Sequence, residues 1–189
     1  MKKIFVTTQY GITIAATQKT VLEKLKRAVS FAVQHDIQSS RLVKRMRAIL
    51  VYPRNGYDNE LFRKSRIWVC EMKTIRESST PYLASLLVHE GWHLAQFSRG
   101  VRNVHSRAER TAYKTQAKFL TAIGDKRGAR WVGQQLRSRA WETKLPSGKN
   151  AVMSRAEHRD FVRRWTRNAT MKHANKMYRH KHRVDFLPM

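Results

Sequence analysis

A pair of histidines on one predicted helix carries the clearest chemistry in this sequence. The segment Leu86–His93 reads LLVHEGWH and contains the pattern His-Glu-x-x-His, formed by His89, Glu90 and His93. Residues four apart in an α-helix lie one above the other, so two imidazoles at that spacing can chelate one metal ion. Imidazole nitrogens bind Zn²⁺ at about 2.0–2.1 Å. The spacing therefore predicts one Zn²⁺ ion with His89 and His93 as two of its ligands.

Glu90 follows the first histidine directly and lies about 100° around the helix from it. From there its carboxylate does not easily join the metal, but it can reach a water molecule bound to the metal. A carboxylate beside a metal-bound water is placed to act as a general base. We therefore predict Glu90 as the catalytic residue and His89 and His93 as metal ligands.

A catalytic zinc site needs a third protein ligand and one open coordination position. The position six residues after His93, where one class of zinc proteins carries a third histidine, is Arg99. Two other candidates lie downstream: His105, twelve residues beyond His93, and Glu109, sixteen residues beyond it.

Glu109 is the favoured third ligand because of its predicted surroundings. On a helix it would share a face with Ala112, Gln116 and Leu120, which is otherwise small or apolar. A carboxylate on a packed face is costly unless it is paired or binds a metal. His105 stays open as the alternative ligand, and a surface ion pair with Arg110 or Lys114 is the alternative role for Glu109.

The pattern resembles the zincin superfamily in its gluzincin arrangement, in which a glutamate on the following helix completes the His-Glu-x-x-His site. The phrase Glu109-x-x-Ala112-Tyr113-x-x-Gln116 is similar to a helix of small bacterial and phage proteins that carry this motif. The resemblance covers about residues 48–123. The shorter spacing to the glutamate, and Tyr113 one turn later, depart from thermolysin-like enzymes.

The resemblance implies an α+β, zincin-like fold in which a short mixed sheet packs on the active-site helix and further helices follow toward the C-terminus. It also implies that a protein or peptide substrate binds as an added strand along the sheet edge, beside Ile67–Met72. Zinc would activate a water for hydrolysis of the amide bond, with Glu90 as the base. Tyr113 and Tyr57 are candidates to stabilise the oxyanion.

The helices and strands that would position these residues can be predicted from the spacing of apolar residues and from residues typical of helix and strand ends. Ser79, Thr80 and Pro81 make a strong helix start, with a hydroxyl cap followed by proline. Two short strands are expected around a turn at Gln9–Gly11. The other expected elements are helices over Val21–His35, Tyr82–Phe97, Ser106–Ile123, Lys126–Trp141 and Ser154–Tyr178, and strands over Ala48–Tyr52 and Ile67–Met72.

The charge of the chain is extreme. Its 189 residues hold 39 Lys and Arg against 13 Asp and Glu, a formal net charge of +26. Such a surface attracts polyanions. We expect an anionic partner: nucleic acid, an envelope polyanion, or an acidic inhibitor or immunity protein. Five basic residues of the tail, interleaved with aromatic residues, are candidates for such contacts: Lys172, Lys176, Arg179, Lys181 and Arg183.

The sequence predicts a catalytic domain over 1–145, with its core at 48–123, and a basic helical extension over 146–189. No stretch is apolar enough to span a bilayer. The apolar run after Met1 is too broken for a signal peptide, so the protein is expected in the cytoplasm as synthesised, with export by a route that needs no cleavable signal left open.

Three functions remain in competition at this stage. The leading one is a zinc metallopeptidase acting as a bacterial toxin or effector. The second is an intracellular or phage-borne protease that works near nucleic acid. The third, from a different class, is a basic polyanion-binding module whose zinc site is structural or vestigial.

Overall fold

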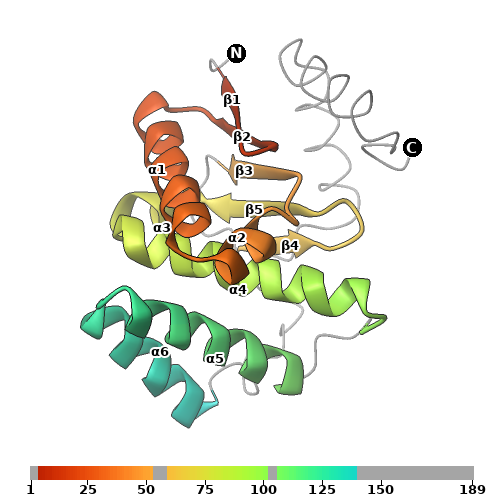
Figure 1. Ribbon diagram of the computed structural model, residues 1–189. Coiled ribbons are helices and arrows are strands. Elements are labelled where there is room, and N and C mark those ends of the chain that lie inside the picture. The colour runs from red at the N-terminus through yellow and green to blue at the C-terminus, as the bar shows by residue number, and fades with distance from the viewer. Residues whose placement is uncertain (1–3, 53–58, 102–105, 140–189) are drawn as a thin grey trace, which may run out of the picture.

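A five-stranded mixed sheet and six helices make up the part of the chain that the structure describes (Figure 1). This computed structural model describes residues 4–52, 59–101 and 106–139. The strands are β1 (Phe5–Gln9), β2 (Ile12–Ala16), β3 (Ala48–Tyr52), β4 (Glu60–Phe62) and β5 (Ile67–Glu71). The helices are α1 (Lys19–His35), α2 (Ile37–Val43), α3 (Met72–Glu77), α4 (Thr80–Ser98), α5 (Ser106–Ala122) and α6 (Lys126–Ser138).

The strands follow the order β1-β2-β3-β5-β4. The strands β2, β3 and β5 run parallel to one another, whereas β1 and β4 lie antiparallel at the two edges. The predicted hairpin is confirmed: Tyr10 and Gly11 adopt φ of 50° and 80° between β1 and β2, which is the left-handed backbone that a two-residue hairpin turn requires.

The sheet corrects one prediction about the substrate-side strand. Ile67–Met72 was expected at the edge, but β5 lies between β3 and β4. The edge is formed by β4, a three-residue strand that pairs with β5 from Glu60↔Val69 to Phe62↔Ile67. Met72 belongs to α3 rather than to the strand, because the backbone turns into a helix directly after Glu71.

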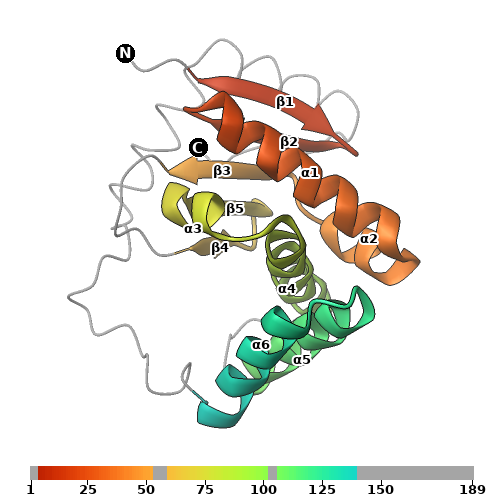
Figure 2. The same ribbon diagram turned by 90° about the vertical axis from the view of Figure 1, so that its left-hand side faces the viewer.

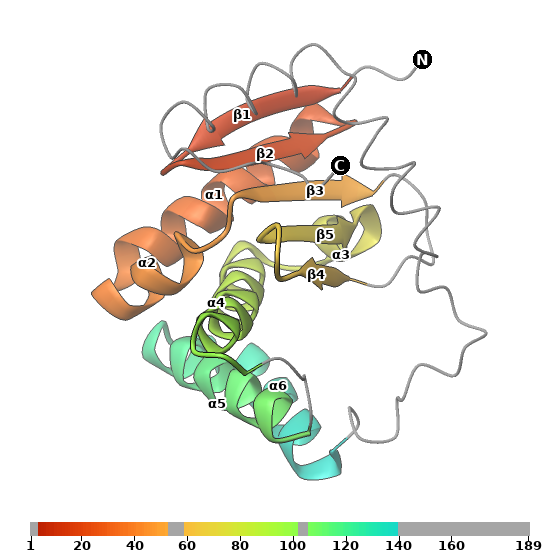
Figure 3. The same ribbon diagram turned by 90° about the vertical axis from the view of Figure 1, so that its right-hand side faces the viewer.

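The main core lies between one face of the sheet and helices α1 to α4, which Figures 2 and 3 show on the same side of the sheet. Trp68 and Cys70 of β5 point into this core, and both are fully buried. The alternate residues of the same strands point to the opposite face, where a smaller apolar cluster forms. That cluster consists of Ala15, Ala48, Leu50, Ile67 and Val69.

Helix α4 begins and ends where the sequence signals predict. The side chain of Ser79 accepts a hydrogen bond from the backbone N–H of Tyr82, and Pro81 occupies the first turn. After Arg99, Gly100 adopts φ of 85°, a left-handed conformation that ends many helices. Ten residues of this helix are buried, and they include His89 and His93 of the His-Glu-x-x-His motif.

Gly91, in the middle of the motif, is the point where α2 crosses α4. A Cβ atom placed on Gly91 would lie 2.5 Å from the backbone oxygen of Leu42 and 2.6 Å from its carbonyl carbon. Only a residue without a side chain allows the two backbones to approach so closely. The glycine therefore fixes how α2 packs on the helix that carries the histidines.

Helices α5 and α6 form a further layer on the side of α4 away from the sheet (Figure 1). Phe119 and Leu120 of α5 and Val132 of α6 are buried in this layer. Helix α6 ends at Ser138, before the predicted Trp141, because Arg139 turns into the left-handed region at φ of 49°. In the described residues no helix combines the length and apolarity that crossing a bilayer would require.

Candidate metal centre

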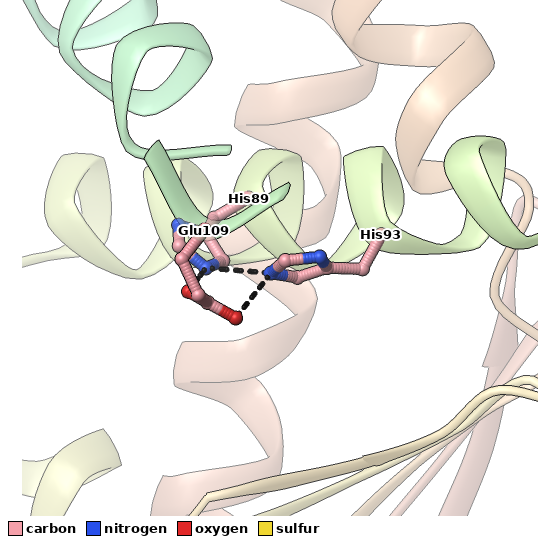
Figure 4. Close-up of side chains that lie close together, drawn as sticks. All are labelled: His89, His93 and Glu109. Carbon is pink, nitrogen blue, oxygen red and sulfur yellow. Dashed lines mark hydrogen bonds and ion pairs between the residues drawn. The ribbon is translucent and has the colours of Figure 1, made fainter. Parts of the chain in front are cut away.

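The three predicted ligands converge between α4 and α5. His89 and His93 project from α4 toward Glu109, in the first turn of α5 (Figure 4). The two Nε2 atoms lie 3.1 Å apart. The carboxylate of Glu109 approaches Nε2 of His89 at 3.5 Å and Nε2 of His93 at 3.1 Å. The two histidines are buried, and the Glu109 side chain is 23% exposed.

The ring of His89 is held by hydrogen bonds on its far side. Its Nδ1 lies 3.1 Å from Oε1 of Gln116, while Nε2 of the same amide donates to Oγ of Ser85 at 3.0 Å. Ser85 in turn donates its own proton to the backbone oxygen of Tyr82. The orientation of the Gln116 amide is thus set by a chain of donors and acceptors, and its oxygen faces the histidine.

An amide oxygen only accepts hydrogen bonds, so Nδ1 of His89 must carry a proton. A neutral ring then presents a bare lone pair at Nε2. His93 follows the same logic, since its Nδ1 lies 3.2 Å from Oε1 of Gln96. A hydrogen bond on one ring nitrogen that orients the other toward a metal is the usual second contact of histidine ligands.

The result is a cluster of groups that repel one another unless a cation lies among them. Two imidazole lone pairs and a carboxylate face the same point, and all three offer electrons rather than protons. In a tetrahedral zinc site with bonds of about 2.0–2.1 Å, neighbouring ligand atoms are separated by about 3.3 Å. Here the two Nε2 atoms are 3.1 Å apart, Nε2 of His89 is 3.5 Å from Oε2 of Glu109, and Nε2 of His93 is 3.1 Å from Oε1 of the same carboxylate. Each separation is close to that value, with the two histidines contacting different oxygens. The donor set therefore fits Zn²⁺.

Glu109 behaves as a carboxylate held in its charged form. Burial by itself would raise its pKa. While no cation lies in the site, however, His89 and His93 can also carry a proton at Nε2, and the hydrogen bonds and positive charge of the rings in that form lower the pKa of Glu109 well below the usual range. For His93, burial acts to lower the pKa, and the contacts with Glu109 and the charge of Glu90 outweigh it and raise the pKa. The site attracts positive charge.

Glu90 occupies a different environment. Its side chain is half-buried and makes no hydrogen bond or ion pair with any described residue. Burial raises its pKa, opposed by the nearby His89 and His93, and the charge of Glu109 raises it further. A carboxylate with a raised pKa beside a metal site is suited to take up a proton and release it again.

Tyr113 reaches the site from α5, one turn after Glu109. Its ring packs edge-on against His89, with the centroids 4.7 Å apart and the planes at 77°. Burial raises the pKa of its hydroxyl, and the charges of Glu109 and Glu90 add to the effect. The phenol is therefore neutral and close to both carboxylates, as a hydrogen-bond donor at this site would have to be.

Several predicted residues lie outside the described part of the chain. They are Tyr57, His105, the C-terminal cluster Lys172, Lys176, Arg179, Lys181 and Arg183, and the helix expected over Ser154–Tyr178. The domain boundary expected near residue 145 lies there as well. The structure brings together His89, His93 and Glu109, with Glu90 and Tyr113 beside them.

Two residues of the site carried a weaker signal in the sequence. Gln116 was placed on the Glu109 face of α5, but no role was assigned to it, although a buried amide seven residues after a ligand lies on the same face. Gln96 lies one turn after His93 and could have been found by the same rule. The contacts of Gln116 with His89 and of Gln96 with His93 can be predicted only when the positions of the neighbouring side chains are known.

Comparisons with known proteins add no relative: no family model, no curated protein and no solved structure matches this chain.

Proposed function

We propose that the protein is a zinc-dependent peptidase whose metal is held by His89, His93 and Glu109. The observation that carries the proposal is the convergence of two oriented imidazole lone pairs and one carboxylate at separations of 3.1 to 3.5 Å. The carboxylate of Glu90, which has no hydrogen bond or ion pair to the described residues and lies beside that cluster, favours a catalytic over a purely structural site. A structural zinc site is usually closed by four protein ligands, whereas three leave a position open.

When bound, zinc supplies a Lewis acid that polarises a carbonyl oxygen and lowers the pKa of a water molecule. The chain supplies the remaining parts. Glu90 accepts a proton from the attacking water and passes it to the amine that leaves. Tyr113 donates a hydrogen bond to the oxygen on which negative charge develops. Gln116 and Gln96 keep the two imidazoles turned toward the centre.

The edge strand β4 offers the surface for a peptide substrate. It is the last strand of the sheet that the described residues form, and an extended peptide can add to a strand at a sheet edge through backbone hydrogen bonds. The guanidinium of Arg63, which follows β4, lies 5.6 Å from the ring centre of Phe97 on α4. This contact ties the end of the edge strand to the helix that carries the motif, one turn beyond His93.

The first test is metal content. The 189-residue protein, purified without chelator, is expected to contain about one Zn²⁺ per chain, as measured by elemental mass spectrometry. The variants His93→Ala and Glu109→Ala are expected to lose the metal, while the control His35→Ala, which removes a histidine outside the cluster, is expected to retain it. Zinc retained in His93→Ala would refute the ligand assignment.

The second test separates catalysis from metal binding. Glu90→Gln keeps the shape of the side chain and is expected to retain zinc while losing hydrolysis of a panel of denatured proteins. The matched control Glu77→Gln changes an exposed glutamate of α3 and is expected to keep full activity. Equal activity of Glu90→Gln and the parent, in hydrolysis or in toxicity toward cells, would leave the zinc site a structural or vestigial part of a polyanion-binding module.

Whether a peptidase of this kind serves as a toxin or effector, or as a protease acting near nucleic acid, is a separate step of the proposal. Expression in host cells distinguishes the two roles. A toxin is expected to stop growth in the parent form and not as Glu90→Gln. A protease acting near nucleic acid is expected to be tolerated by cells and to cleave nucleic-acid-bound proteins faster than free ones.

A further inference from the structure

Helix α5 carries a row of basic residues on the face opposite the metal site. Arg107, Arg110, Lys114 and Lys118 recur at intervals of three and four residues, the spacing that places side chains on one side of a helix. All four are exposed. The other face of α5 holds Glu109 and the buried Gln116.

Helix α6 repeats the arrangement. Its buried side is formed by Gly128 and Val132. Four exposed basic residues occupy its outer side: Lys126, Arg127, Arg130 and Arg137. Trp131 lies among them, 44% exposed, with the edge of its ring against Tyr82 at a centroid distance of 5.7 Å. We call these eight basic residues of α5 and α6 the hairpin cluster.

In the described part of the chain, no acidic side chain neutralises the positive charge of the hairpin cluster. None of its eight side chains forms an ion pair with a described residue. Residues 106–139 contain only two acidic residues, and both are engaged. Glu109 faces the histidines, and Asp125 caps α6 by accepting from the backbone N–H of Gly128 at 2.9 Å. Eight like charges on two neighbouring helices repel one another and attract a polyanion.

The apolar sides of α5 and α6 are buried within the fold. This burial distinguishes a membrane surface from a nucleic acid as the partner of the cluster. A helix that lies in a membrane interface needs a free apolar face to enter the lipid. Here Ala112, Phe119, Leu120 and Val132 are buried, and Trp131 is the one exposed large apolar residue of α5 and α6. A surface of cations with one exposed aromatic ring instead fits phosphates in solution and a stacked base.

We propose that the hairpin cluster binds nucleic acid through its phosphates, with Trp131 as a stacking surface for an unpaired base. Recognition is expected to be largely independent of base sequence, because the cluster consists of exposed Lys and Arg side chains that contact phosphates, and the sequence contains no base-reading motif. The proposal does not rest on zinc or on peptidase activity. It assigns the hairpin, which the structure describes, as a nucleic-acid surface separate from the tail cluster expected from the sequence.

The test compares two full-length variants that lose the same charge. One replaces Arg107, Arg110, Lys114 and Lys118 of α5 by glutamine. The control replaces four exposed basic residues elsewhere by glutamine: Lys19, Arg41, Lys64 and Lys73. Both keep residues 140–189, so the contribution of that segment is equal. Circular dichroism verifies that both variants fold.

Affinity for a fluorescent thymidine 20-mer and for a DNA duplex is measured by anisotropy between 50 and 200 mM salt. Each phosphate contact adds a log–log slope of about −0.7 on a single strand. The α5 variant is therefore expected to flatten the slope by about 2.8, whereas the control keeps the slope of the parent. Trp131→Ala is expected to weaken the single strand more than the duplex, because only unpaired bases can stack on the ring.

Three results would overturn the proposal. Equal flattening in the α5 variant and the control would make the effect one of total charge. An unchanged slope in the α5 variant would exclude the hairpin cluster from the contact. Binding to vesicles of anionic phospholipid that depends on the α5 residues, with no such dependence for either oligonucleotide, would assign the surface to lipid.

Discussion

Replacing Gly91 by alanine tests the packing that fixes the motif helix in the fold. The added methyl group would meet backbone atoms of Leu42 at 2.5 and 2.6 Å, and the Cβ of Leu42 at 3.1 Å. Ordinary van der Waals contact begins at 3.4 Å, so α2 and α4 must separate by about 0.9 Å, the difference between 3.4 and 2.5 Å. A flexible side chain could rotate away, but a carbonyl group within a helix cannot.

The expected cost follows from two opposing effects. Overpacking a well-filled site costs about 1–3 kcal/mol, and a collision with backbone belongs at the upper end of that range. Alanine in place of glycine inside a helix stabilises the helix by about 1 kcal/mol. Gly91→Ala is therefore expected to lower the free energy of unfolding by about 2 kcal/mol.

The chain contains a matched control in Gly133 of α6. A Cβ placed there meets only the guanidinium of Arg137, at 3.7 Å. Gly133→Ala gains the same helix propensity without a collision and is expected to raise the free energy of unfolding by about 0.5–1 kcal/mol. Urea unfolding followed by circular dichroism measures both variants. Chelator is present throughout, because a bound metal would add its own stabilisation.

The reasoning fails if Gly91→Ala is as stable as the parent, or more stable, while Gly133→Ala gains stability as expected. Such a result would mean that α2 does not cross α4 at this glycine. A loss of stability in both variants would instead point to an effect of alanine unrelated to the Leu42 contact.

Two further predictions concern the interior. Gln116→Ala removes the acceptor that orients His89 and is expected to weaken zinc binding about 10–100-fold, as measured by competition with a chromogenic chelator. Gln116→Glu keeps an acceptor oxygen and is expected to restore most of the lost affinity. Unchanged zinc affinity in the alanine variant would exclude a positioning role for Gln116. Cys70 is fully buried, and burial raises the pKa of its thiol, so it should resist Ellman's reagent in the folded protein and react once per chain in denaturant. Rapid reaction of the native protein would contradict the position of β5 in the core.

The motif helix could be predicted closely because each signal for it is local. Ser79 and Pro81 mark its start, Gly100 marks its end, and the apolar period runs between them. Helix α5 was predictable for the same reason. These elements are specified by residues within a few turns of one another, so neither required knowledge of the rest of the fold.

The missed elements depend on contacts between distant parts of the chain or are too short to show a period. Strand β4 has three residues, one of them Glu60, and exists as a strand only through its pairing with β5. Helix α2 is seven residues long, although Asp36 caps it by accepting from the backbone N–H of Ser39 at 2.8 Å. In α3 the apolar run of β5 continues into Met72, which concealed the change from strand to helix.

For the site, the limits of prediction are similar. His89 and His93 share a helix, so their spacing alone places their rings together. Glu109 was favoured because a carboxylate on a packed face needs a partner, and the structure places it beside both rings. The amide contact of Gln116 to His89 depends on how α5 lies across α4, which no local pattern encodes.

The ligands come from two helices, and this gives a bound ion a mechanical role. His93 lies on α4 and Glu109 on α5, sixteen residues apart in the chain. An ion held by both would close that loop as a cross-link does, and closing a loop of about 15 residues is worth about 3 kcal/mol in the chain-entropy account of disulfides. The chain has one cysteine, Cys70, and so cannot form a disulfide within itself. Metal coordination would then act as the cross-link that holds the layer of α5 and α6 against α4. Removal of the metal is expected to loosen that layer before the sheet unfolds.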